Sequence, residues 1–348
     1  MGGDRWEPSV AVAGVLVALV LTAGLGALVV RTAAAGAAAS LGRGPVVLAA
    51  APSPVALPER FRAAGYTLPR GASVYAAQVL TSPGGSLRLV EYEAGGGANG
   101  GDFWPASSVK VMVALGALDF LRTLGFTGAA TVQWPSGWST SVRALINDAI
   151  DDSANDAYDL LVQIAGLDRL NTSFLSPANG FSDTVIQRSY AGYDIHSSPQ
   201  LLITEGPRSV TVPARSSSAV YDCPQWGNCS TLHDMAESIR RVILHDELPP
   251  AQRFNVDRSD IRALAGALLA AEGWMDPGVA RALGIRARVY NKPGFASGLD
   301  CLDVGLVEDV ATRRRFVLAM TVPVASAGDQ GCGVLAGMAE AVLEALVT

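Results

Sequence analysis

The sequence predicts an α+β fold, in which strands from both ends of the chain build an antiparallel β-sheet with flanking helices and an all-α lobe is inserted between them. Two strand patterns, Val74–Leu80 and Leu87–Tyr92, flank the turn sequence Ser-Pro-Gly-Gly at 82–85. Three more strand patterns lie near the end of the chain, at 287–291, 302–307 and 316–323. Helical periodicity fills the region between them, over 156–165, 232–244 and 258–271, and an amphipathic helix over 334–346 closes the chain. Strands at both ends with helices between them are typical of this fold class.

The first 58 residues divide into an apolar segment and a linker. Pro8 to Val30 are 23 consecutive uncharged, mostly apolar positions, long enough to span a bilayer and longer than the apolar core of a signal peptide, roughly 7–15 residues. We therefore expect a single-pass transmembrane anchor over 1–31, or a cleaved signal, for which 33–37 supply small residues. Residues 32–58 are rich in Ala, Gly and Pro, as in linkers. This leaves 59–348 for one folded domain.

The composition excludes several classes of function. The net charge is −6, and the only basic run is Arg313–Arg315, which gives no support for nucleic acid as a partner. The three histidines have no metal-ligand spacing and the four cysteines form no C-x-x-C motif, so we predict neither a metal site nor a cofactor. An apolar content of 49% is enough for a sizeable core.

A serine and a lysine begin the most apolar helical pattern in the folded part. Pro105 favours a helix start, and Ser107 and Lys110 lie three residues apart on one face. The chain has 26 Lys plus Arg, yet only two of these, Lys110 and Lys292, are lysine. A buried lysine loses its proton readily, whereas arginine stays charged. This pairing therefore predicts a serine nucleophile beside an amine base.

Two further motifs follow in the chain. Ser153 and Asn155 precede an apolar helix, where such residues commonly serve only as N-caps. Lys292-Pro293-Gly294 lies at the end of a predicted strand, where a lysine is ordinarily just solvated. The scarcity of lysine argues against that simple interpretation for Lys292.

Ser-x-x-Lys, Ser-x-Asn and Lys-x-Gly, in this order, resemble the three motifs of the penicillin-recognising serine enzymes, and the surrounding sequence is most similar to the class A β-lactamase-like branch. The resemblance covers roughly 60–348. It implies that Ser107 attacks an amide carbonyl and forms an acyl-enzyme, with Lys110 as base or proton relay. Ser153 would pass a proton to the leaving nitrogen, and Lys292 would supply positive charge for a substrate carboxylate.

The resemblance also implies the substrate-binding groups. Asn155 would hydrogen-bond the substrate amide, and the backbone N–H groups of Ser107 and of Phe295, one residue past Gly294, would form the oxyanion hole. The implied protein is a membrane-anchored, extracytoplasmic serine hydrolase of cell-wall peptides or similar acyl-amides. Its expected partners are the membrane and a peptide or β-lactam-like small molecule.

The sequence departs from that family in three places. Ala154 replaces the usual aspartate of the second motif, which the peptidase relatives tolerate. Pro293 replaces a threonine or serine of the third motif and removes a hydroxyl that helps to hold a substrate carboxylate. Tyr190 aligns with the glutamate that deacylates class A β-lactamases, and Asp194 and Glu205 are the nearby carboxylates downstream.

These departures disfavour an efficient β-lactamase. Two alternatives remain open: a β-lactamase with a non-standard deacylating base, and a catalytically inactive domain that binds peptidoglycan or a protein.

The four cysteines allow three pairings. Cys223 and Cys229 bracket five residues of a long loop, and Cys301 and Cys332 flank strands of the C-terminal sheet. In an exported domain we favour Cys223–Cys229 and Cys301–Cys332. Four reduced thiols in a cytoplasmic domain are the alternative.

The charges that flank the apolar segment Pro8–Val30 disagree with an extracytoplasmic location of the folded domain. By the positive-inside rule they weakly favour a cytoplasmic C-terminal side, and we set this aside because of the cysteines and the expected chemistry.

Overall fold

The structure is a computed structural model that describes residues 55–97, 103–221, 223 and 227–347. The predicted anchor over 1–31 lies outside the described residues. The first described residues, Val55 and Ala56, fall within the segment predicted as a linker, and they form a short strand that pairs with Tyr92 and Glu93.

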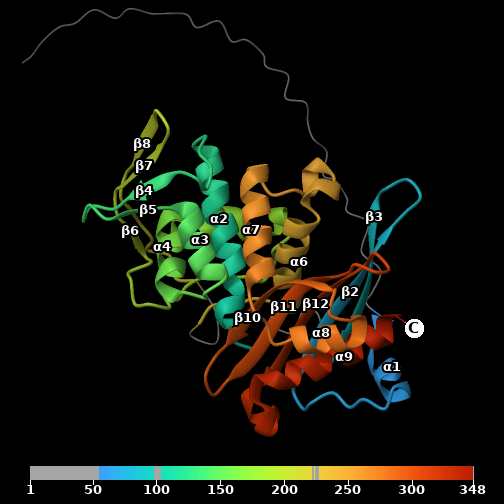
Figure 1. Ribbon diagram of the computed structural model, residues 1–348. Helices are drawn as coiled ribbons and strands as arrows, with labels where there is room; N and C mark the ends of the chain where they lie inside the picture. The colour runs from blue at the N-terminus through green and yellow to red at the C-terminus, as the bar shows by residue number, and fades with distance from the viewer. Residues whose placement is uncertain (1–54, 98–102, 222, 224–226, 348) are drawn as a thin grey trace, which may run out of the picture. The chain divides into compact units, whose positions relative to one another are not determined.

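The core of the fold is a six-stranded sheet with the order β1-β3-β2-β12-β11-β10 (Figure 1). Its strands are β1 (Val55–Ala56), β2 (Ser73–Thr81), β3 (Leu87–Ala94), β10 (Arg288–Phe295), β11 (Asp300–Asp309) and β12 (Arg314–Pro323). All neighbours are antiparallel except β1 and β3, which are parallel. Because β12 pairs with both β2 and β11, the two ends of the chain meet in the middle of the sheet, which confirms the predicted fold class.

Three helices cover one face of this sheet: α1 (Pro58–Ala63), α8 (Asp276–Leu283) and α9 (Val334–Val347). In the described part of the chain, one helical stretch, Gln330–Val347, is long and apolar enough to cross a membrane. Its side chains Leu335, Met338 and Val342 are fully buried in the core against the sheet. Its apolar character is therefore explained by packing within the domain.

The inserted lobe lies against the opposite face. Its main helices are α2 (Lys110–Thr123), α3 (Val142–Ile150), α4 (Asn155–Ala165), α6 (Leu232–Ile243) and α7 (Arg258–Ala270), with the single turn α5 (Leu167–Arg169). Helix α6 contacts β2, β11 and β12 and joins the lobe to the sheet. Helix α2 is apolar almost all round and is buried from Lys110 to Leu118, so it forms the centre of the lobe.

The sequence predicts an all-α lobe, and this prediction is wrong. The lobe carries a four-stranded sheet with the order β5-β4-β7-β8 and a two-stranded sheet of β6 and β9. Their strands are β4 (Thr131–Gln133), β5 (Ser139–Ser141), β6 (Ser197–Ser198), β7 (Leu201–Glu205), β8 (Arg208–Val212) and β9 (Arg215–Ser216). These strands have two to five residues, which is too short for their period-2 patterns to stand out from loop sequence.

Both disulfides favoured from the sequence are formed, Cys223–Cys229 and Cys301–Cys332. The first closes a loop between the lobe's small strands and α6. The second ties the start of β11 to the segment just before α9. No free cysteine is left in the described residues.

Candidate active site

Ser107 lies on a tight turn that leads into α2. The predicted helix start at Pro105 is a 3₁₀ turn over Ala106–Val109, and the α-helix itself begins at Lys110. Ala106 has a φ of 45°, which is uncommon for a residue other than glycine. The backbone N–H of Trp104 donates to Asp300 Oδ2 at 2.9 Å, so this turn is fixed to the start of β11.

Lys110 lies beneath this turn and is fully buried. Its Nζ donates to the Ser153 carbonyl at 2.5 Å and to Asn155 Oδ1 at 2.7 Å. Burial, and then the positive charge of Lys292, lower the pKa of Lys110 to about 7. A substantial fraction of this amine is therefore neutral near pH 7, as a base requires.

The second motif does not serve as a helix cap. Ala154 is the N-cap of α4 and has no side-chain capping bond, while Asn155 is the first residue of the helix. Ser153 has a φ of 55°, and its carbonyl and that of Ala106 both accept hydrogen bonds from side chains of the site. The capping interpretation is thus wrong, and the motif surrounds the amine of Lys110.

The structure brings Lys110, Ser153 and Asn155 together directly, as the sequence predicts for the first two motifs. Ser107 and Lys110 share the turn, but among the described residues no hydrogen bond joins Ser107 Oγ to Lys110 Nζ. Lys110 Nζ instead donates hydrogen bonds to Ser153 and Asn155.

Lys292 lies within β10, the edge strand, and is 1% exposed. Burial lowers the pKa of Lys292 to about 8, although nearby Asp303 and then Asp151 oppose that shift. The positive charge of Lys292 in turn contributes to the lowered pKa of Lys110.

The register of β10 explains why proline is accepted beside this lysine. Ala296 and Asp300 are opposite each other and exchange two backbone hydrogen bonds. In an antiparallel ladder every second pair is hydrogen-bonded, so the next such pair is Gly294 with Leu302. Pro293 and Phe295 belong to the non-hydrogen-bonded pairs, so the backbone nitrogens of both residues face away from β11. Pro293 therefore sacrifices no ladder hydrogen bond, and the Phe295 N–H remains directed to the open edge of the sheet, where the Ser107 turn packs.

Gly294 allows the strand to approach the Ser107 turn closely. A Cβ atom at this position would lie 2.6 Å from Ser108 Oγ and 2.8 Å from the Pro105 carbonyl. Any side chain here would push the turn away from β10, and Phe295, 54% exposed, would move with the strand. The spacing between the predicted oxyanion donors thus depends on a glycine.

We expect Gly294→Ala to lower the rate of Ser107 acylation about 10²-fold, since a displacement near 1 Å has effects of that order. Overpacking should also lower the free energy of unfolding by about 1–3 kcal/mol. The matched control is Gly337→Ala on α9, where a Cβ meets nothing within 4 Å. Acylation rates from intact-protein mass spectrometry, with denaturant titrations for both variants, check this. Equal acylation by the two variants would contradict the close-approach explanation.

Tyr190 lies directly against the Ser107 turn. Its hydroxyl donates to the Ala106 carbonyl at 2.6 Å, and its ring centroid is 5.7 Å from Lys110 Nζ. The ring also stacks on Tyr158, with centroids 4.4 Å apart. Burial raises the pKa of the Tyr190 phenol well above its usual range, so the group stays protonated and is no base near neutral pH.

A buried aspartate positions Tyr190. The carboxylate of Asp159, on α4, accepts hydrogen bonds from Ser189 Oγ and from the backbone N–H groups of Tyr190, Ala191 and Tyr193. With four donors on its two oxygens, Asp159 is a structural anchor for this turn. The sequence analysis missed it, although a charged residue among the apolar residues of the helical pattern over 156–165 was an available signal.

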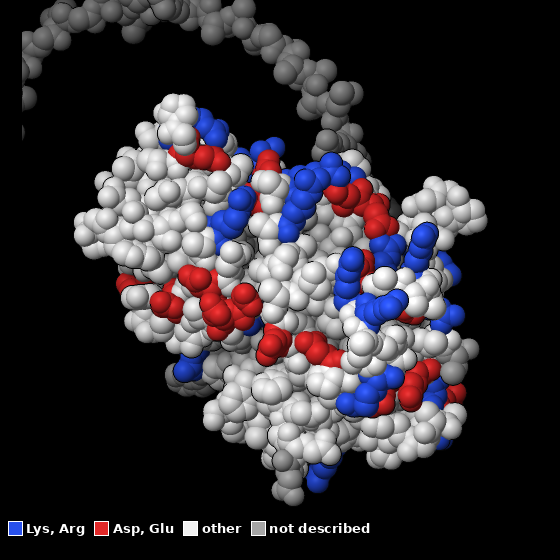
Figure 2. All heavy atoms as spheres, in the orientation of Figure 1, with Lys and Arg blue, Asp and Glu red and all other residues white. Residues whose placement is uncertain are grey.

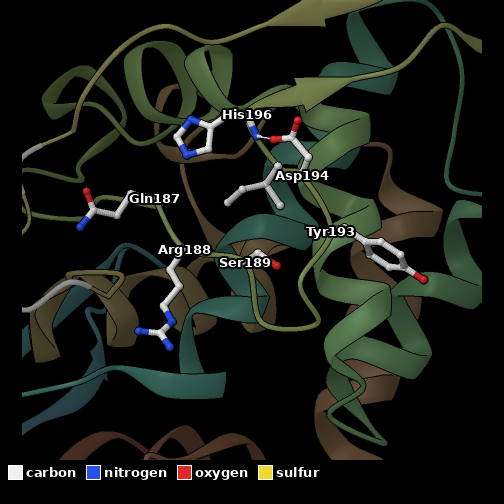
Figure 3. Close-up of a pocket in the computed structure, with 7 residues that line it drawn as sticks. Gln187, Arg188, Ser189, Tyr193, Asp194 and His196 are labelled. Carbon is white, nitrogen blue, oxygen red and sulfur yellow. Dashed lines mark hydrogen bonds between the residues drawn. The ribbon is translucent and has the colours of Figure 1, made fainter. Parts of the chain in front are cut away.

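Asp194 and Glu205 make their hydrogen bonds with residues other than the predicted catalytic side chains. Asp194 is exposed, and its carboxylate accepts a hydrogen bond from the His196 backbone N–H at 3.0 Å (Figure 3). A hydrogen bond from Ser197 lowers the pKa of Asp194, which makes it a weaker base. Glu205 instead binds Thr127 and Arg208. The cavity of about 480 Å³ in this view is lined by Gln187, Arg188, Ser189, Tyr193, Asp194, Ile195 and His196, so it is separate from the predicted catalytic side chains.

A model of the family described as "Beta-lactamase enzyme family" matches residues 101–346. A search of curated proteins found no match.

Several solved structures share the fold. A class A β-lactamase from Mycobacterium abscessus is 17% identical, with a TM-score of 0.56 over 84% of this chain and 98% of that chain. A β-lactamase from Burkholderia vietnamiensis is 17% identical, with a TM-score of 0.55 over 84% and 95% of the two chains. A mutant of PBP-A, solved as an acyl-enzyme complex with penicillin G, is 16% identical, with a TM-score of 0.53 over 79% and 90%. At these identities the similarity establishes the fold.

Proposed function

Because this chain belongs to the β-lactamase enzyme family and is a serine hydrolase, we propose that Ser107 takes the acyl group of an amide substrate and holds it as a long-lived acyl-enzyme. The observation that carries this proposal is the pairing of a deprotonatable Lys110 with a protonated Tyr190 at the same turn. The first favours acylation. By the resemblance to class A β-lactamases, the second replaces the glutamate that would activate water.

In the proposed acylation step, Ser107 Oγ attacks the carbonyl carbon and its proton passes to the neutral amine of Lys110. The negative oxygen is received by the backbone N–H groups of Ser107 and Phe295. Lys110 returns the proton through Ser153, whose Oγ is 3.4 Å from Nζ, to the leaving nitrogen, and the C–N bond breaks. An ester on Ser107 and a free amine result. Asn155 would hold the substrate amide and Lys292 its carboxylate.

Hydrolysis of that ester requires water and a base. Asp159 is saturated by its four donors, and Asp194 and Glu205 are engaged elsewhere. These contacts disfavour the alternative of a β-lactamase with a non-standard base. The depressed pKa values of both lysines disfavour an inactive binding domain, because no packing role requires two buried amines.

The substrate class and the location are part of the same proposal. We infer that the substrates are cell-wall peptides or related acyl-amides, and that β-lactams acylate Ser107 as mimics. Two disulfides favour an oxidising compartment, which supports an extracytoplasmic domain. The apolar segment Pro8–Val30 would anchor it to the membrane.

The test is a time course of intact-protein mass spectra after addition of a β-lactam panel. We expect a stoichiometric adduct on the wild type that decays slowly, and no adduct on Ser107→Ala. With nitrocefin, a single burst fits the proposal, whereas rapid multiple turnover would overturn the long-lived acyl-enzyme. Absence of any adduct, while a related penicillin-binding control is labelled fully, would overturn acylation by β-lactams. Full biological function in both Ser107→Ala and Lys110→Ala would favour the inactive domain.

A further inference from the structure

A second cavity, of about 640 Å³, lies beside the first turn of α4 and contains none of the predicted catalytic side chains. Its walls come from the β4–β5 hairpin, from α3, from α4 and from the turn that Asp159 anchors. Its lining includes Trp134, Trp138, Asp148, Asp156, Gln163 and Tyr193. We call it the hairpin groove.

Aromatic side chains form one side of the hairpin groove. The rings of Trp134 and Trp138 are in contact, with centroids 4.9 Å apart. Trp134 Nε1 donates to Gln163 Oε1 at 3.1 Å, which fixes that ring to α4. Trp138 and Tyr193 are 48% and 45% exposed, unusually open for large aromatic residues. The groove thus offers π-faces to solvent from a fixed support.

The charged side chains that line the groove are all negative. Asp148 and Asp156 line it, and no Lys, Arg or His does. Burial, and then the charges of Asp152 and Asp156, raise the pKa of Asp148, as expected where carboxylates repel one another without a cation between them. In the described residues no ion pair involves either lining aspartate. Figure 2 shows this acidic cluster near the lower ends of α3 and α4.

Neighbouring residues of the chain connect the hairpin groove to the predicted active site. Asp156 directly follows Asn155 on α4, and its charge acts on the pKa of Lys110. Tyr193 lies three residues beyond Tyr190 in the turn held by Asp159. The groove therefore borders the residue that we expect to hold the substrate amide.

We propose that the hairpin groove binds a primary ammonium group on an aliphatic arm, such as a lysine-like side chain of the substrate peptide. The carboxylates supply the complementary charge, and the rings of Trp138 and Tyr193 receive the cation and the methylene chain. This inference rests on the proposed function for the identity of the ligand as part of an acyl-amide substrate. Its chemistry, an organic cation on aromatic and acidic walls, follows from the groove itself.

The test is calorimetric titration of the full chain with two probes, Nα-acetyl-lysine methylamide and its Nε-acetylated form. They differ by one positive charge. We expect the ammonium probe to bind at least about tenfold more tightly, and its affinity to fall on raising the salt concentration. Asp148→Asn and Trp138→Leu should each weaken it about three- to tenfold. The matched control is Trp274→Leu, since Trp274 is exposed to a similar degree, 39%, but lies outside the groove.

Three outcomes would overturn the proposal. One is equal affinity for the two probes, and another is no binding of the ammonium probe by the folded wild type. The third is binding of an N-acetylglucosamine trimer that depends on Trp138 and not on Asp148, which would make the groove a sugar site. β-Lactam acylation of Asp148→Asn and Trp138→Leu, expected at the wild-type rate, reports on Ser107 separately. Failure of groove binding and failure of the proposed function are therefore distinguishable.

Discussion

Tyr190→Glu is expected to convert the persistent acyl-enzyme into one that is hydrolysed, with the deacylation rate raised about 10²-fold or more. Tyr190 lies against the Ala106 carbonyl and Lys110, and its backbone is held by Asp159. A carboxylate on this backbone would point to the Ser107 ester and accept a proton from water. A positioned general base contributes typically about 10²–10⁴-fold. Decay of the penicillin adduct in intact-protein mass spectra measures the rate.

Tyr190→Gln is the matched control, because it creates the same space without a base. It should deacylate slowly, like the wild type or only slightly faster. Equal acceleration by both variants would show that tyrosine acts by excluding water alone. No acceleration by Tyr190→Glu, in protein that circular dichroism shows to be folded, would contradict the assigned position. Both variants lose the stacking on Tyr158 and should melt at a lower temperature.

Replacement by arginine should affect the acylation rate very differently at the only two lysines of the chain. Lys110→Arg is expected to lower the acylation rate about 10³-fold, because arginine cannot be the neutral base. Lys292→Arg keeps the positive charge and should retain most of the activity. Rates of β-lactam acylation for the two variants and the wild type measure this, and equal loss in both would contradict the separate roles.

The pH dependence follows from the same two amines. Lys110 acts when neutral, so acylation should rise with pH through its pKa of about 7. Lys292 acts when charged, so acylation should fall as pH rises through its pKa of about 8. The wild type should therefore show a narrow bell-shaped profile. Lys292→Arg should remove the alkaline limb, and a profile unchanged by this substitution would contradict the assignment.

Much of the fold was predictable because its long elements have clear patterns. The hairpin of β2 and β3, the C-terminal strands and the helix that became α2 all combine length with an unambiguous hydrophobic period. The site was predictable from an unusual feature of the composition, the near absence of lysine. Two lysines among 24 arginines identified Lys110 and Lys292, and both proved to be buried.

The rest depended on contacts that local sequence does not encode. Asp159 gains its role only when the 189–193 turn folds over α4, and the hairpin groove exists only where β4, α3 and α4 meet. Pro293 appears as a defect in a motif until the register of β10 shows that its missing N–H faces the open edge. Periodicity predicts which residues are buried but not which distant groups they meet.

The place of β12 has a consequence for how the chain is made. Thr321 pairs with Ser73, so the edge of β2 that faces β12 stays unpaired in a growing polypeptide until residues 314–323 have been synthesised. Such edges readily recruit other chains. Gly294 and Asp300, which support the Ser107 turn, also come from this late segment. Neither the complete sheet nor the nucleophile's surroundings can therefore form before β10, β11 and β12 have been synthesised, so formation of the active site depends on the last strands of the sheet.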